Sequence, residues 1–127
     1  MPSRKNRAAA RRSRRNRSKT QADAVCRYIR QWIDAYRNDM YLAIALDRLL
    51  ELMNSYLEEV GEEGLDNVKI TKEDVKKCID GTVKVVAADN GREVLWLWGG
   101  RLFRDVINKI IAVAGREGEA VVVAGII

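Results

Sequence analysis

The sequence contains no histidine, a single proline and only two cysteines. Without histidine the chain cannot form a Ser-His-Asp triad or a His-ligated zinc site, and it lacks the side chain that most often acts as a general base. Cys26 and Cys78 lie far apart in the chain, which excludes a zinc knuckle and a CxxC redox motif. Their spacing leaves open whether they form a disulfide.

Several motifs that would carry catalysis or cofactor binding are also missing. None of the four serines lies in a GxSxG motif, and the sequence has neither a GxxxxGK[ST] nor a GxGxxG phosphate-binding loop. The acidic stretch 58–65 (EEVGEEGL) is interrupted by glycines and has no third type of metal ligand nearby, so it predicts a solvated loop. We therefore expect no enzyme activity, catalytic residue, metal, cofactor or small-molecule substrate.

Long apolar runs are absent as well. No stretch reaches the roughly 18 consecutive apolar residues that a transmembrane helix needs, so we expect no membrane-spanning segment. An organellar transit peptide is disfavoured, because Ala8–Ala10 are the only apolar side chains between Ser3 and Thr20.

What the sequence does have is a strong separation of charge. The formal net charge is +5, but residues 1–20 carry nine lysines and arginines and no acid. The rest of the chain carries 14 basic residues against 18 acidic ones, a net charge of −4. The protein is therefore predicted to be an acidic body (residues 20–127) with a polycationic arm (residues 1–19).

The arm predicts binding to nucleic acid. Arginine outnumbers lysine there, and its planar fork pairs with phosphate oxygens. Because the arm lacks aromatic residues for base stacking and matches no base-reading motif, we expect sequence-independent contacts to double-stranded DNA. A solvated tail or a nuclear-localisation patch is the alternative. The arm residues predicted to bind are Arg4, Lys5, Arg7, Arg11, Arg12, Arg14, Arg15, Arg17 and Lys19.

Apolar periodicity predicts helices through most of the body. The first runs from an N-cap at Thr20 to about residue 37, with Val25, Ile29 and Ile33 inward. On its polar face Arg27, Arg30 and Arg37 extend the predicted nucleic-acid surface, unless that face is merely solvated.

The second predicted helix is capped by Asp39 and runs to about Val60, and a third opens at the capping box Thr71–Asp74. A last helix covers about residues 92–114. The expected fold class is thus all-α, with the basic N-terminal arm as a helix followed by a bundle of about four helices.

One segment supports an alternative α+β fold with a hairpin at residues 82–98. Both halves of this segment are rich in β-branched or aromatic residues, and Asn90-Gly91 between them favours a tight turn. The apolar C-terminal tail, residues 120–127, reads as extended in either fold. It is expected to pack either on a neighbouring subunit or on its own domain.

In this organisation the chain resembles the small major coat proteins of filamentous and rod-shaped double-stranded-DNA viruses of hyperthermophilic archaea. The resemblance rests on the arm at residues 4–19, the helix-forming Ala8–Ala10, a Trp- and Tyr-bearing helix at 22–37 and a helical remainder. It implies a coat (capsid) nucleoprotein that wraps A-form DNA in a helical virion, paired with other copies of itself or with a paralogous coat chain.

Two further hypotheses use the same arm differently. A cellular chromatin or nucleoid protein, in the cytoplasm rather than in a virion, would bind DNA as a dimer without forming a regular filament. An RNA-binding protein would use the Arg-rich arm to recognise a particular RNA hairpin in preference to duplex DNA.

Overall fold

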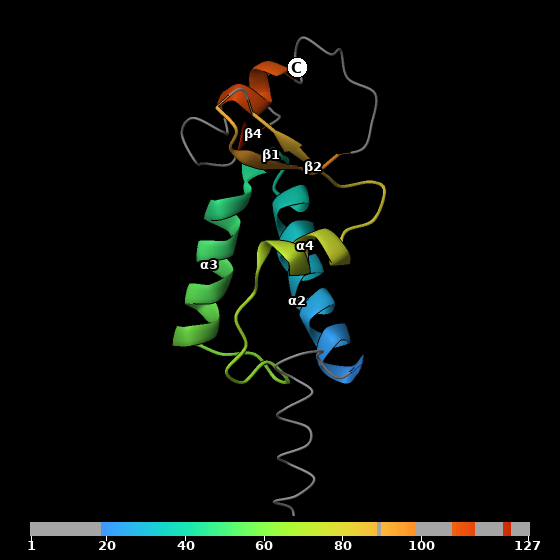
Figure 1. The fold of residues 1–127 in the computed structure, drawn as a ribbon, viewed down its shortest axis with the longest axis vertical. Coiled ribbons are helices and arrows are strands. Elements are labelled where there is room, and N and C mark those ends of the chain that lie inside the picture. Colours follow the sequence, from blue (N-terminus) through green and yellow to red (C-terminus); the bar gives the residue numbers. More distant parts are fainter. Residues whose placement is uncertain (1–18, 89, 99–107, 114–120, 123–127) are drawn as a thin grey trace, which may run out of the picture.

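The computed structural model describes residues 19–88, 90–98, 108–113 and 121–122, so most of the basic arm lies outside the described residues. Residues 108–113 are helical. The other elements are α2 (Lys19–Asn38), β1 (Tyr41–Ala45), α3 (Leu46–Glu59), α4 (Lys72–Cys78), β2 (Lys84–Ala87), β3 (Glu93–Trp96) and β4 (Val121–Val122) (Figure 1).

The all-α prediction is wrong. The four strands form one antiparallel sheet in the order β2-β3-β1-β4, and the body is therefore α+β, as the hairpin alternative proposed. Figure 1 shows α2 and α3 side by side beneath the sheet, with residues 108–113 on the sheet's other side. A bundle of about four helices is not what these residues form.

Strand β1 occupies the start of the predicted second helix. The chain leaves α2 at Asn38, turns through Met40 with a φ of 67°, and enters β1 directly. Four of the five β1 residues are buried, because the strand lies between β3 and β4 and is covered on both faces. Helix α3 then begins at Leu46, so Asp39 is not its cap, and Ala45 makes no side-chain cap hydrogen bond.

The hairpin forms between β2 and β3, where Val85 pairs with Leu95 and Val86 with Val94. It replaces the end of the predicted third helix and the start of the last one. In its turn Gly91 has a φ of 83°, a conformation that glycine adopts without steric cost.

The predicted helix starts had opposite outcomes. The capping box at Thr71 is confirmed, since its hydroxyl accepts from the Asp74 amide and the Asp74 carboxylate accepts from the Thr71 amide. Thr20 is not an N-cap, because Lys19 before it already belongs to α2.

Two apolar clusters lie on opposite faces of the sheet. Leu95 and Leu97 belong to the larger one, which fills the space between the sheet, α2, α3 and α4. Val94 and Trp96, which alternate with these two leucines along the chain, pack on the other face with helical residues 108–113. This alternation follows from the two-residue period of a strand. It explains why a strand with both faces covered reads as one continuous apolar run.

The C-terminal tail contributes to this sheet. Val121 and Val122 form β4, which pairs antiparallel with β1 of the same chain. This part of the tail therefore packs on its own domain, whereas residues 123–127 lie outside the described residues.

The long connection between α3 and α4 is held by one asparagine. The Asn54 side chain accepts from the Ile70 amide (2.8 Å) and donates to the Ile70 carbonyl (3.0 Å), so it pairs both backbone groups of a residue that is only 1% exposed. Asn54→Ala removes both bonds, and we expect it to lower the free energy of unfolding by about 2 kcal/mol. Urea denaturation measures this loss. The neighbouring, exposed Ser55→Ala is the control, and an equal effect of both variants would contradict the pinning role.

Candidate nucleic-acid interface

The arm joins the body at the end of α2 that lies farthest from the sheet (Figure 1). Of the predicted arm residues, only Lys19 falls within the described residues, where it is exposed and begins α2. The predicted positions between residues 4 and 17 lie outside them. Their contribution therefore rests on charge: seven arginines and one lysine without a single acid.

The outer face of α2 carries the other three predicted residues, but it is not purely basic. Five charged residues follow one another at spacings of three or four residues, which places them on the same side of the helix: Asp23, Arg27, Arg30, Asp34 and Arg37. The first four of them, with Cys26 and Gln31, line an open cavity of about 520 Å³. The acids interrupt the basic stripe that the sequence predicted.

Two of these arginines contact other elements of the body. Arg30 donates from Nε to the carbonyl of Cys78 (3.2 Å) at the end of α4. The Arg37 guanidinium lies over the Trp98 ring, 5.0 Å from its centroid. Arg27 is exposed and makes no hydrogen bond or ion pair with the other described residues, so it is the α2 arginine that is most available to a phosphate.

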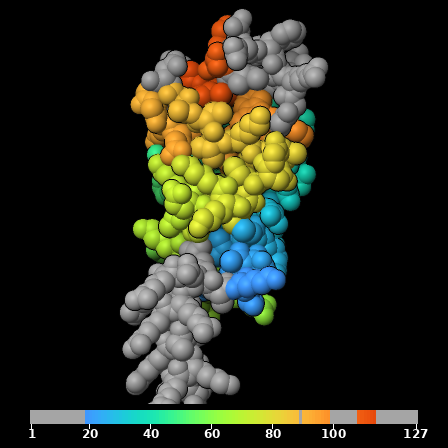
Figure 2. Space-filling view, turned by 45° about the vertical axis from the view of Figure 1, so that its right-hand side comes forward, coloured from blue at the N-terminus to red at the C-terminus, as the bar shows by residue number. Residues whose placement is uncertain are grey.

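Sequence reasoning missed a second surface with exposed lysines, on α4 and the hairpin, which also carries the exposed acids Glu73 and Asp80. Lys76 and Lys77 are exposed on α4, and Lys84 is exposed on β2. Lys77 and Lys84 make no ion pair with any described residue. In Figure 2 α4 and the hairpin form one continuous face of the molecule. The sequence feature that could have indicated this surface is the pair Lys76-Lys77, which lies between the capping box at Thr71 and the hairpin turn at Asn90-Gly91.

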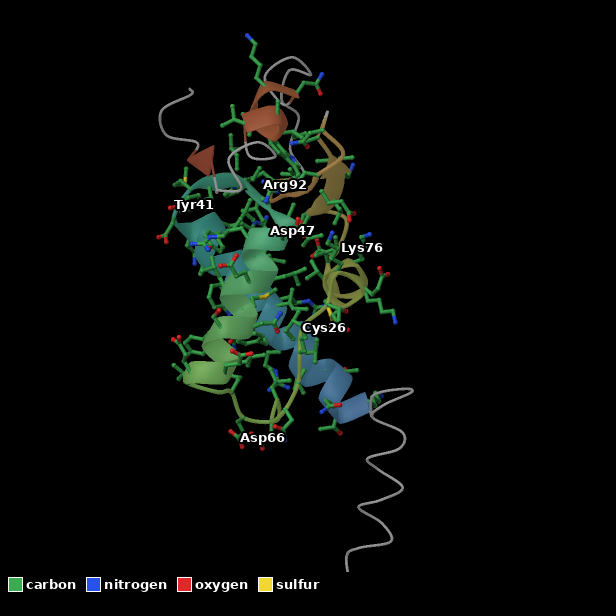
Figure 3. The ribbon with its side chains drawn as sticks, turned by 60° about the vertical axis from the view of Figure 1, so that its left-hand side comes forward. Cys26, Tyr41, Asp47, Asp66, Lys76 and Arg92 are labelled. Atoms are coloured by element: carbon green, nitrogen blue, oxygen red, sulfur yellow. A yellow bond between two sulfur atoms is a disulfide. The ribbon has the colours of Figure 1, made fainter. Side chains whose placement is uncertain are left out.

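Ion pairs tie this surface to the rest of the body. Lys72 contacts Asp47 (3.2 Å) and Glu93 (3.6 Å), while Lys76 contacts Glu93 (3.0 Å) and Arg92 contacts Asp47 (3.8 Å). Figure 3 shows Asp47, Lys76 and Arg92 where α3, α4 and the hairpin meet. The hydrogen bond that Lys76 donates lowers the pKa of the Glu93 carboxyl. The hydrogen bond that Lys72 donates to Asp47 raises the pKa of the Lys72 amine. The cluster therefore fixes α4 against the hairpin.

A disulfide between Cys26 and Cys78 joins α2 to α4, which settles what the cysteine spacing left open (Figure 3). Helix α4 has seven residues, a length at which an isolated helix is not stable in water. Its place on α2 depends on this bond, on buried Val75 and on the hydrogen bond from Arg30. The α4 lysines are thus presented by a rigid support.

Two absences apply to the described part of the chain. It contains no group of three or more His, Cys, Asp or Glu side chains that could hold a metal ion. No helix in it combines the length and the hydrophobicity that crossing a bilayer requires.

Comparisons with protein-family models, with curated proteins and with solved structures find no match for this chain.

Proposed function

We propose that this protein binds double-stranded DNA without sequence specificity, with the basic arm as the main contact and the α4–hairpin surface as an additional one. The observation that carries the proposal is the separation of charge: nine basic residues and no acid in the first twenty residues, attached to an acidic body. The positive charges of such a segment neutralise phosphates of any base sequence. Duplex DNA carries one phosphate charge per about 1.7 Å of helix axis.

The body offers further cations outside the arm. Lys77 of α4 and Lys84 of β2 are exposed and make no ion pair with any described residue, so both are available to phosphate. Lysine binds phosphate as a point charge, a contact that carries no base-sequence information.

We do not extend the proposal to a virion coat. The resemblance to filamentous-virus coat proteins implied a helical bundle for the body, and an α+β body takes its place. The DNA-binding half of that expectation depends on the arm and is unaffected. An RNA-binding role is distinguished by the experiment below.

The proposal predicts a steep dependence of DNA affinity on salt. If all nine arm cations contact phosphate, log K should fall against log salt concentration with a slope of about −8. Fluorescence anisotropy with three duplexes of unrelated sequence measures this slope, and all three should bind with the same affinity. A slope shallower than about −3, or a clear preference for an RNA hairpin over the duplexes, would contradict the proposal.

A further inference from the structure

A pocket between α2 and α3 is lined by aromatic rings and one carboxylate. Its walls are Tyr28, Gln31, Trp32 and Ala35 of α2, Tyr56 of α3 and Glu62 of the following loop, and its volume is about 300 Å³. It contains none of the lysines and arginines described above, and it shares only Gln31 with the lining of the α2 cavity.

The Trp32 ring of this pocket meets both tyrosine rings at steep angles, while Tyr28 and Tyr56 are tilted by 33° with centroids 6.4 Å apart. Trp32 meets Tyr56 at 81° with centroids 6.1 Å apart, and it meets Tyr28 at 73° with centroids 6.2 Å apart. The Tyr28 hydroxyl donates to the carbonyl of Met53 (2.7 Å), which holds its ring in place. Tyr56 is 39% exposed and Trp32 half-buried, so their rings are accessible from solvent.

Glu62 adds a negative charge to this aromatic pocket. Gly61, with a φ of 84°, turns the chain at the end of α3 and brings Glu62 back towards α2. The Glu62 carboxylate makes no ion pair with any described residue. Tyr28 and Glu62 line the same pocket. Burial raises the pKa of Tyr28, and the charge of Glu62 raises it further. Aromatic faces beside an unpaired carboxylate attract a flat cation.

We propose that this pocket binds an arginine guanidinium from the basic arm of a second copy of the chain. The arm supplies seven arginines in a segment without acids, so its charge is complementary to that of Glu62. The arm precedes Lys19, the first residue of α2, and the pocket lies nine or more residues further along this helix, at Tyr28, Gln31 and Trp32. The chain's own arm would have to fold back along α2 to reach the pocket, whereas the arm of another copy needs no such reversal.

The test uses full-length chains of two kinds. The first is isotopically labelled and arm-neutral, with the arginines at positions 4, 7, 11, 12, 14, 15 and 17 replaced by glutamine. The second is unlabelled, with a wild-type arm and the substitution Glu62→Gln. NMR follows the three tryptophan indole signals of the labelled chain, and Trp32→Phe assigns one of them.

Adding the unlabelled chain should shift the Trp32 signal and leave that of Trp98 in place, since the Trp98 indole already donates to the Tyr41 carbonyl (2.7 Å). Glu62→Gln in the labelled chain should weaken this binding about fivefold, whereas Glu63→Gln, an exposed neighbour outside the pocket, should not. No shift of Trp32 at several hundred micromolar would overturn the proposal. A concentration-independent difference in the Trp32 signal between wild-type and arm-neutral chains would overturn it too, by assigning the pocket to the chain's own arm.

Discussion

The arm-neutral chain should lose at least about a thousandfold in affinity for duplex DNA at 0.1 M salt. Replacing seven arginines by glutamine leaves Lys5 and Lys19 as the only arm cations, so the salt slope should fall from about −8 to about −2. The body alone has a net charge of −4, and without the arm it repels the phosphate backbone overall. Fluorescence anisotropy at several salt concentrations measures both the affinity and the slope.

Two controls separate the arm from the body. Arg27→Gln removes one exposed charge of α2 and should reduce the slope by no more than about one, with an affinity loss of a few-fold. The double variant Lys77→Gln/Lys84→Gln tests the α4–hairpin surface and should cost about tenfold or less. If the arm-neutral chain binds within threefold of wild type while this double variant loses most of its affinity, the main contact is the body and the proposed division of roles is wrong.

The sequence predicts the end of α2 and the start of α4 well and the central strand badly. Helix α2 ends at Asn38, as its apolar period indicates, and the capping box at Thr71 marks the start of α4. Strand β1 was missed because its buried run, Leu42–Ala45, continues directly into Leu46 of α3, and Leu42, Leu46 and Leu49 recur at helical spacing. A strand covered on both faces has no polar alternation, so its pattern resembles that of a buried helix.

The hairpin shows where local chemistry was the better guide. Residues 83, 86, 95 and 98 also fit a helical period, and that fit favoured the bundle. Asn90 accepts a hydrogen bond from the amide of Arg92, and Gly91 takes a left-handed φ, so these two residues specify the turn that the period overlooked. The backbone requirement at a turn is met by few residue types, whereas apolar spacing fits several structures.

The candidate binding sites also include one part that the sequence predicts and one part that it does not. The arm is visible in the composition alone, because charge separation needs no tertiary information. The pocket is not, since it joins Tyr28, Tyr56 and Glu62 from three segments that only the pairing of α2 with α3 brings together. The internal roles of Arg30 and Arg37 also depend on tertiary contacts, with the Cys78 carbonyl and the Trp98 ring respectively. Helical periodicity places those arginines on one face, but it does not say what covers that face.

Reduction of the Cys26–Cys78 disulfide should lower the free energy of unfolding by about 4 kcal/mol. The bond closes a loop with a sequence separation of 52, and the loop-closure model gives about this value for such a length. The effect should be concentrated on α4, whose other attachments include buried Val75, the hydrogen bond from Arg30 and the ion pairs with Asp47 and Glu93. Urea denaturation with and without a phosphine reductant measures the loss.

The double variant Cys26→Ser/Cys78→Ala is the control for the reductant, because its unfolding curve should not respond to it. DNA binding supplies the second readout. Since the arm is proposed to carry most of the affinity, the reduced protein should bind duplex DNA within about tenfold of the oxidised one as long as the body stays folded. A loss of stability below 1 kcal/mol on reduction would show that packing alone holds α4 on α2. A loss of affinity as large as that of the arm-neutral chain would instead make the position of α4, and not the arm, the main determinant of binding.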